Sequence, residues 1–262
     1  IGILDRYMIC LNKTDQVISA VTQPFLPTPP IDTQLNPSIY SFQWYKGSIE
    51  QVDLAPNNYI IPGATSASFS PSSEGTYTVL ATNISSGCRI PASTEVVSSY
   101  PPESIGVEIK SVLFSDNNIL EVSVVGTGIY EYRIDFGPWQ QEPTFTNVRI
   151  GDHIIYVRDL LNCNAISQKK IVIGYPKFFT PNGDGYHDTW NIIGMTVKSS
   201  SKIYIFDRYG KLLKQISPTG EGWDGTFNGE RLPSSDYWFV LDYNEPVTGE
   251  INQLRANFTL KR

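Results

Sequence analysis

The feature that most constrains the fold is the alternation of apolar and polar residues in short runs. It is clearest at Tyr40–Tyr45, Leu120–Val124 and Tyr130–Asp135. Successive side chains of a strand point to opposite faces of a sheet, so this period of two predicts strands that bury one face. The 18 prolines and 20 glycines are spread along the chain, as many short turns require. The sequence therefore predicts an all-β protein.

A length of 262 residues suits two or three domains. The stiff segment Tyr100–Glu103, which contains two prolines, separates a unit at 1–99 from a second at 104–174. A third unit is expected at 175–262. In the first unit, Trp44 and Tyr77 match the core tryptophan and the tyrosine corner of an immunoglobulin-like sandwich, although Val79 stands where an antibody domain has its second cysteine.

The first two units end in similar sequence patterns. Gly75–Asn83 is followed by Gly87 and Cys88, and Gly151–Asp159 is followed by Asn162 and Cys163. Self-similarity of this kind is typical of tandem arrays of related domains. The predicted fold class is therefore a series of tandem immunoglobulin-like β-sandwich domains.

Charge and motifs exclude several functions. A net charge of −6 without a basic stripe argues against binding to nucleic acid. No apolar run reaches the roughly 20 residues that a membrane-spanning helix needs. The two histidines, His153 and His187, fall in a core position and in a turn, and no base-plus-nucleophile motif accompanies them. We expect no enzyme activity from these residues.

One run, Phe178–Asp188, resembles a binding loop. Asn182, Asp184 and Asp188 supply oxygen ligands of the kind that Ca²⁺ prefers, which makes calcium the only cofactor that the sequence suggests. The loop is not an EF-hand, because Tyr186 and Ile193 occupy positions where that motif has ligands. The alternative is that these side chains cap turns while the glycines supply positive φ. Trp223, between glycines, is expected to be exposed, and Trp238, inside an alternating strand, is expected to be in the core.

The unit at 175–262 resembles the gliding-motility-associated C-terminal domain, the type B sorting domain of the type IX secretion system. The runs that carry the resemblance are Phe178–Gly185, His187–Trp190, Ile203–Lys211, Gly222–Gly225, Asp236–Phe239 and Phe258–Arg262. The unit at 1–99 resembles immunoglobulin-like modules of Bacteroidetes surface proteins. The unit at 104–174 is similar to the SprB repeat through Tyr130–Asp135, Gly137–Trp139, Phe145–Asn147 and Val157–Asp159.

These resemblances imply the C-terminal portion of a secreted cell-surface adhesin whose last domain directs export and surface attachment in gliding bacteria. The implied partners are the outer-membrane translocon and an anchoring outer-membrane protein, while upstream repeats would hold an extracellular surface or polysaccharide. The expected contact is an exposed edge strand, with the terminal residues Phe258, Thr259, Leu260, Lys261 and Arg262 presented to the partner. The alternative is the non-catalytic C-terminal region of a secreted polysaccharide-degrading enzyme.

The three cysteines, Cys10, Cys88 and Cys163, lack the CxxC spacing of a zinc or redox site. A disulfide between Cys10 and Cys88 would link the first strand to the turn after the strand of Tyr77. Since the resemblance implies export and oxidising compartments favour pairing, we expect this bond, with two free thiols as the alternative.

Overall fold

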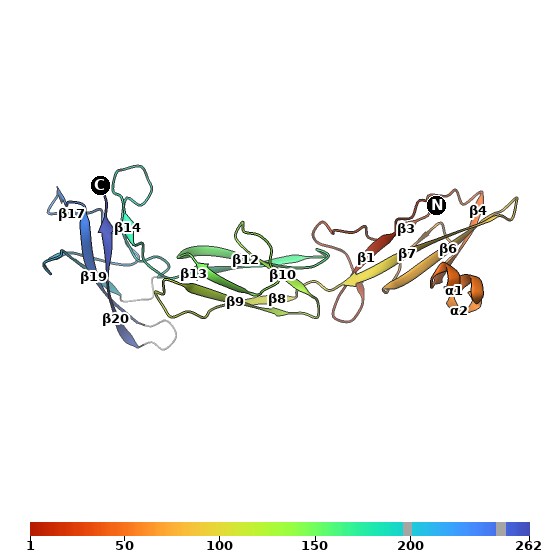
Figure 1. The fold of residues 1–262 in the computed structure, drawn as a ribbon, viewed down its shortest axis with the longest axis horizontal. Helices are drawn as coiled ribbons and strands as arrows, with labels where there is room; N and C mark the ends of the chain where they lie inside the picture. The colour runs from red at the N-terminus through yellow and green to blue at the C-terminus, as the bar shows by residue number, and fades with distance from the viewer. Residues whose placement is uncertain (196–200, 245–249) are drawn as a thin grey trace. The chain divides into compact units, whose positions relative to one another are not determined.

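The computed structural model describes residues 1–195, 201–244 and 250–262, and its regular structure is almost entirely β-strand (Figure 1). The all-β prediction is confirmed. Two short helices, α1 (Ile49–Leu54) and α2 (Pro56–Tyr59), follow one strand of the first sheet. Ser48 and Gln51 form a capping box at the start of α1, which explains why a helix begins there. None of the helices in the described residues is long and apolar enough to cross a membrane.

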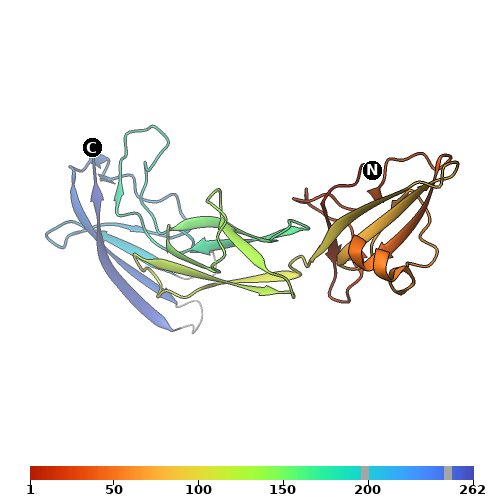
Figure 2. The ribbon, with the colours of Figure 1, turned by 45° about the vertical axis from the view of Figure 1, so that its right-hand side comes forward.

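The first module packs a five-stranded sheet against a two-stranded one. The larger sheet has the order β2-β1-β7-β6-β4, with β1 and β7 parallel, and the smaller one pairs β3 with β5. Figure 2 shows the two helices beside the larger sheet. The strands are β1 (Arg6–Leu11), β2 (Val17–Ile18), β3 (Ile31–Asp32), β4 (Tyr40–Lys46), β5 (Ser68–Phe69), β6 (Gly75–Asn83) and β7 (Arg89–Ser99).

The core of this module confirms the immunoglobulin-like prediction. Trp44 is completely buried, donates its indole N–H to Ser66 O at 2.9 Å, and stacks on Phe69 with the ring centroids 5.4 Å apart. The Tyr77 hydroxyl donates to Ser73 O at 2.8 Å, which is the hydrogen bond of a tyrosine corner. Val79 is fully buried where an antibody domain has a cysteine, so packing alone holds the two layers together at that position.

The segment after the linker forms two three-stranded sheets, ordered β10-β12-β13 and β11-β9-β8. Leu120, Val122, Ile155 and Val157 alternate with more exposed residues and are buried, as their period of two predicts. The strands are β8 (Ser104–Ile109), β9 (Asn118–Val125), β10 (Tyr130–Ile134), β11 (Thr144–Val148), β12 (Gly151–Asp159) and β13 (Ala165–Val172).

The last module contains a second five-stranded sheet, ordered β14-β20-β19-β15-β16, and the small hairpin β17-β18. β14 and β20 run parallel, and the other neighbouring strands of the large sheet are antiparallel. The strands are β14 (Phe178–Phe179), β15 (Lys202–Phe206), β16 (Leu212–Ile216), β17 (Thr226–Phe227), β18 (Glu230–Arg231), β19 (Ser235–Asn244) and β20 (Ile251–Leu260).

The chain divides into two compact units, and the segment 104–174 contributes to both. The first unit comprises Ile1–Val107, Val122–Pro143 and Ile155–Gln168, and the second comprises Glu108–Glu121, Thr144–Ile154 and Lys169–Arg262. The three-domain division at 1–99, 104–174 and 175–262 stays a prediction.

Candidate functional site: the last module and the disulfide junction

An aromatic cluster forms the core of the last module. Phe179, Trp190, Trp223, Phe239 and Phe258 are each no more than 1% exposed. Trp190 and Phe258 stack with their ring centroids 3.8 Å apart and their planes 10° from parallel. The indole N–H groups of Trp190 and Trp223 donate to backbone carbonyls at 2.8 and 2.9 Å, so burying these tryptophans leaves no unpaired donor. The five rings therefore form one connected core that joins β14, β19 and β20.

The loop after β14 is organised around the carboxylate of Asp188. It accepts the backbone N–H groups of Asn182, Gly183 and Gly185 at 3.0, 2.6 and 2.8 Å. Asp184 accepts the N–H of Tyr186 at 2.8 Å in the same loop. Gly183 and Gly185 have φ of 83° and 88°, a backbone region that suits glycine. The oxygens proposed as metal ligands therefore bind the backbone and shape the turn.

Calcium at Asn182, Asp184 and Asp188 stays a prediction. In the part of the chain that the structure describes, no group of three or more His, Cys, Asp or Glu side chains is placed to hold a metal ion. An ion would have to compete with three backbone N–H groups for the Asp188 oxygens. A rise in melting temperature in millimolar calcium would support the site, and an unchanged melting temperature would contradict it.

Acid is expected to loosen this loop. The backbone N–H groups of Gly183 and Gly185 hold the pKa of Asp188 below its ordinary value of 3.8. Because the pKa is lower in the folded state, the stabilisation is complete above the ordinary value and is lost as the pH falls through the lowered one. The amide NMR shifts of Gly183 and Gly185 should titrate with a midpoint below pH 3.8. Asp188→Asn should remove this titration, and a midpoint at or above the ordinary value in the unmodified protein would contradict the assignment.

The interpretation of Phe258–Arg262 as an exposed edge strand is wrong. β20 lies between β14 and β19, so this end of the strand is hydrogen-bonded on both sides. Thr259 N–H donates to Lys177 O at 2.9 Å, and Lys261 N–H donates to Phe179 O at 3.0 Å. Phe258 and Leu260 are buried in the aromatic core, while Lys261 and Arg262 remain exposed. The Arg262 guanidinium donates to two backbone carbonyls, so the last residue is also tied to the module.

The two tryptophan expectations are also wrong. Trp223, expected to be exposed, is 1% exposed and pairs its backbone with Trp190. Trp238, expected to be in the core, is 49% exposed because its neighbours Tyr237 and Phe239 take the inward positions of β19. Alternation shows that one face of a strand is buried but does not show which one when both faces carry aromatic residues.

The two histidines lie far apart in the sequence, and each contacts neighbouring residues that explain its position in the fold. The ring Nε2 of His153 lies 2.8 Å from Arg149 O, and the side chain is buried. His187 is exposed at a positive φ of 53° in the loop after β14, with its ring centroid 6.0 Å from that of Phe178.

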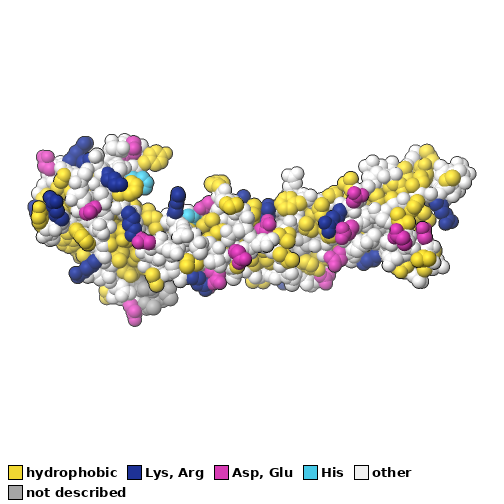
Figure 3. All heavy atoms as spheres, viewed as in Figure 1, with side chains coloured by type: hydrophobic (Ala, Val, Ile, Leu, Met, Phe, Trp, Pro, Cys, Tyr) yellow, Lys and Arg dark blue, Asp and Glu magenta, His cyan; other side chains and the backbone are white. Residues whose placement is uncertain are grey.

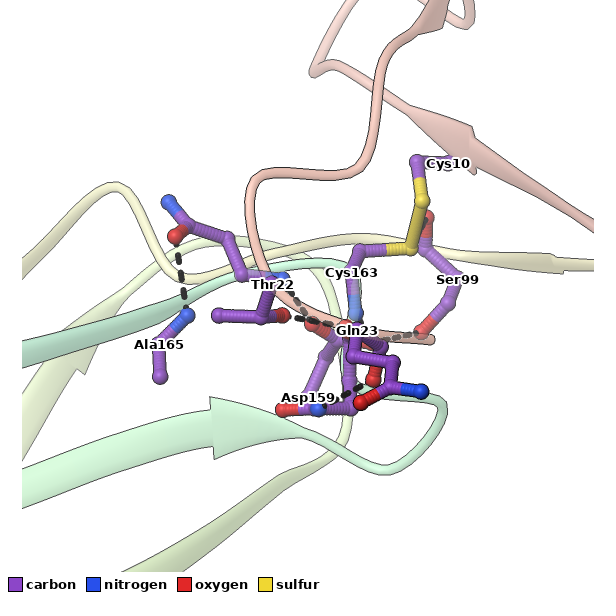
Figure 4. The surroundings of a disulfide bond; sticks show 9 residues. Cys10, Thr22, Gln23, Ser99, Asp159, Cys163 and Ala165 are labelled. Carbon is purple, nitrogen blue, oxygen red and sulfur yellow. Dashed lines mark hydrogen bonds between the residues drawn. A yellow bond between two sulfur atoms is a disulfide. The ribbon is translucent and has the colours of Figure 1, made fainter. Parts of the chain in front are cut away.

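The disulfide joins Cys10 to Cys163, and the prediction of a Cys10–Cys88 bond is wrong (Figure 4). The two Cα atoms are 5.7 Å apart although 153 positions separate them in the sequence. Cys88 is an exposed free thiol in the turn after β6. The local sequence held a signal for this: Cys10 lies in the apolar run Tyr7–Leu11, whereas Cys88 follows two serines and a glycine.

Hydrogen bonds surround the disulfide and join the segment after β2 to the turn after β12. Val21 N–H donates to Cys163 O at 2.8 Å, and the Asn162 side chain donates to Gln23 O at 2.7 Å. The fully buried Asp159 carboxylate accepts from Ser99 Oγ at 2.7 Å and from Cys163 N–H at 3.0 Å (Figure 4). A buried carboxylate needs such partners, so this junction is an ordered part of the first unit.

A second layer of the same junction consists of rings and guanidinium groups. The Arg158 guanidinium lies 4.0 Å from the ring centroid of Trp139 and 4.9 Å from that of Phe25, and it forms an ion pair with Glu131 at 2.9 Å. The Arg133 guanidinium lies 4.7 Å from the centroid of the same Trp139 ring. Cation–π contacts that are partly shielded from water stabilise by about 0.5 to 2 kcal/mol each. The contact with Phe25 adds to the disulfide in holding residues 20–26 against β12, and the contacts with Trp139 and Glu131 fix Arg158 in place.

Residues 173–254 match the model of a family described as the CHU_C type IX secretion signal domain. The resemblance of the last module to a type IX secretion signal is thereby confirmed. The chain contains a signal for export across the outer membrane, and it is a region of a secreted protein. A search of curated proteins finds no match.

Several solved structures match this chain at low sequence identity. The three N-terminal domains of the Hoc capsid protein of bacteriophage RB49 are 12% identical, with 87% of this chain and 89% of that chain covered and a TM-score of 0.30. A titin fragment of three immunoglobulin domains is 13% identical, with 100% and 98% covered and a TM-score of 0.34. Dimeric latent PorU from Porphyromonas gingivalis is 14% identical, with 97% of this chain and 32% of that chain covered and a TM-score of 0.24.

Proposed function

We propose that the last module is the signal for export and surface attachment of a cell-surface adhesin used in gliding motility. The observation that carries the proposal is the match of residues 173–254 to a type IX secretion signal domain. Its partners would be the outer-membrane translocon and an outer-membrane protein that retains the adhesin. Further repeats of the same protein would contact the extracellular surface or polysaccharide.

The modules before this signal are proposed to act as a spacer. Tandem immunoglobulin-like sandwiches extend a surface protein without requiring chemistry of their own. A disulfide between Cys10 and Cys163 suits a protein that works outside the cell, where thiols are oxidised. Basic and acidic side chains are interspersed over the face seen in Figure 3, as suits an exposed spacer.

The complete export signal is proposed to begin before residue 175, because earlier segments pack on the last module. The ring of Phe114 meets that of Tyr243 edge-on with the centroids 5.4 Å apart. Asp116 forms an ion pair with Lys177 at 2.6 Å. Both belong to the compact unit that also contains the segments 108–121 and 144–154. Cutting the chain at 175 would expose the apolar groups that these segments cover.

A reporter-export experiment tests the proposal. A fluorescent protein carrying residues 104–262 is expected to leave cells that have this secretion system, and the same protein carrying 1–174 is expected to stay inside. A fusion carrying only 175–262 should be exported less well because it lacks Phe114 and Asp116. Intracellular retention of the 104–262 fusion, with the reporter folded, would contradict the proposed function.

A further inference from the structure

The outward side of the large sheet in the last module carries a compact apolar surface. Tyr237, Phe239 and Leu241 are buried, so the intervening Trp238 and Val240 must point away from the core. Strand register places Phe206 opposite Trp238 and Tyr204 opposite Val240. A register shift in β16 then places Leu212 opposite Phe206. We call this set the aromatic face, and its members are Tyr204, Phe206, Leu212, Trp238 and Val240.

Exposure singles out the centre of the aromatic face. Trp238 and Leu212 are each 49% exposed, and Phe206 lies between them in register. Three of the five tryptophans, Trp44, Trp190 and Trp223, are completely or almost completely buried, and Trp139 is half-buried under two arginines. A contiguous exposed apolar surface on a folded domain is a common mark of an interaction site.

A polar rim surrounds this centre, and its members bind one another. Arg255 Nε donates to Gln253 Oε1 at 2.8 Å, and Gln253 Nε2 donates to Asp242 Oδ1 at 2.7 Å. On the next strand, Lys202 stands opposite Asp242. Thr259 Oγ1 donates to Asp236 Oδ1 at 2.6 Å at the other end of the face. The rim thus carries two basic and two acidic side chains, Lys202, Arg255, Asp236 and Asp242, with no net charge.

We propose that the aromatic face, centred on Trp238, is the surface by which a protein of the export machinery reads this module. The inference rests on the proposed function, because a secretion signal must be read by a second protein. The terminal residues cannot supply the contact as a free strand, since β20 is paired on both sides there. An aromatic centre inside an ordered polar rim is the anatomy of a protein–protein interface, and tryptophan is the residue most often found at its energetic centre.

The chemistry of the face defines the kind of partner it fits. The partner needs a flat apolar patch of similar width, bordered by side chains of both signs that complement the neutral rim. A nucleic acid or an acidic polymer would gain no counterion release from a surface without net charge. Gln253 and Asp242, at the border of the face, already bind each other, which leaves them less available to the hydroxyl groups of a sugar chain. A protein of the outer-membrane machinery is therefore the favoured occupant.

The test uses a reporter followed by residues 1–262 and compares three variants. Trp238→Ala is expected to lower the exported fraction by at least about tenfold, as truncation of a residue at the centre of an interface does. Asn257→Glu places a charge opposite Trp238 without removing any core contact, and it should lower export as well. Tyr186→Ala is the matched control, because Tyr186 is 77% exposed in the loop after β14 and outside the aromatic face. Thermal melting of each purified variant establishes that it is folded.

Each outcome decides between the two proposals. We expect the unmodified protein and Tyr186→Ala to be exported. We expect Trp238→Ala and Asn257→Glu to be folded but not exported. Equal export of the unmodified protein and of both face variants would overturn this inference and leave the secretion function intact. Retention of the unmodified protein would overturn both. Normal export of Trp238→Ala combined with lost binding to insoluble cell-surface polysaccharide would also overturn it, and would identify a sugar as the occupant.

Discussion

Replacing Phe258 by alanine is expected to lower the unfolding free energy of the last module by about 3 to 5 kcal/mol. Phe258 is 1% exposed and stacks on Trp190 at 3.8 Å, so the shorter side chain would leave a cavity between rings that cannot close over it. Denaturant unfolding followed by tryptophan fluorescence measures the change, because Trp190 and Trp223 report on this core. A loss of this size is a large part of the stability of a small domain.

The neighbouring residue provides the control for this prediction. Thr259 points to the other side of β20, where its hydroxyl donates to Asp236 at 2.6 Å. Thr259→Ala removes one partly exposed hydrogen bond, so we expect a change of about 1 kcal/mol or less. If Phe258→Ala and Thr259→Ala unfold at the same denaturant concentration, the aromatic core does not hold the module together. If Phe258→Ala also stays inside the cell, a folded module is required for export.

Replacing Cys10 by serine is expected to destabilise the first unit by about 2 to 5 kcal/mol, the usual range for a native disulfide. The bond closes a loop across 153 positions, and loop-closure entropy grows only slowly with length. Because the bond ties β1 to the turn after β12, the effect should fall mainly on the junction between residues 20–26 and that turn. Limited proteolysis near Thr22 and thermal melting measure it, and Cys163→Ser should behave in the same way.

Cys88 is the matched control for the disulfide. It is an exposed free thiol, so Cys88→Ser should melt like the unmodified protein. Thiol labelling of the folded, unreduced protein should find one reactive group, and none in Cys88→Ser. A melting temperature of Cys10→Ser equal to that of Cys88→Ser would show that the hydrogen bonds and the Arg158 contacts hold the junction without the disulfide. Two reactive thiols in denatured, unreduced Cys163→Ser would agree with the Cys10–Cys163 pairing, because a Cys10–Cys88 bond would leave none.

Local patterns predicted most of the fold. Tyr40–Tyr45 became β4, and the run Tyr237–Tyr243 lies inside β19. Trp44 and Tyr77 took the expected core positions, because those positions follow from alternation within single strands. The last module was recognised from glycines, aromatic residues and their spacing, and the family match at residues 173–254 confirms that part.

The predictions that were wrong all depend on contacts between segments that are distant in the sequence. The partner of Cys10 is Cys163 rather than Cys88 because the turn after β12, not the turn after β6, meets β1. The end of β20 is interior because β14, some 80 positions earlier, adds to its free side. No spacing within the sequence reports which strands become neighbours, since pairing is decided by packing of the whole module.

The run Phe178–Asp188 shows both sides of this division. By itself, the sequence determined a turn rich in glycine and acidic residues that follows an aromatic strand, because φ preferences and side-chain capping act over a few residues. The tertiary structure decided that Phe179 belongs to a core with Trp223 and Phe258, and that Phe178 lies outside it beside Lys261. It also decided that Trp238 lies on the surface. Burial is a property of the assembled sheets, and a strand of alternating aromatic residues fits either face until its neighbours are in place.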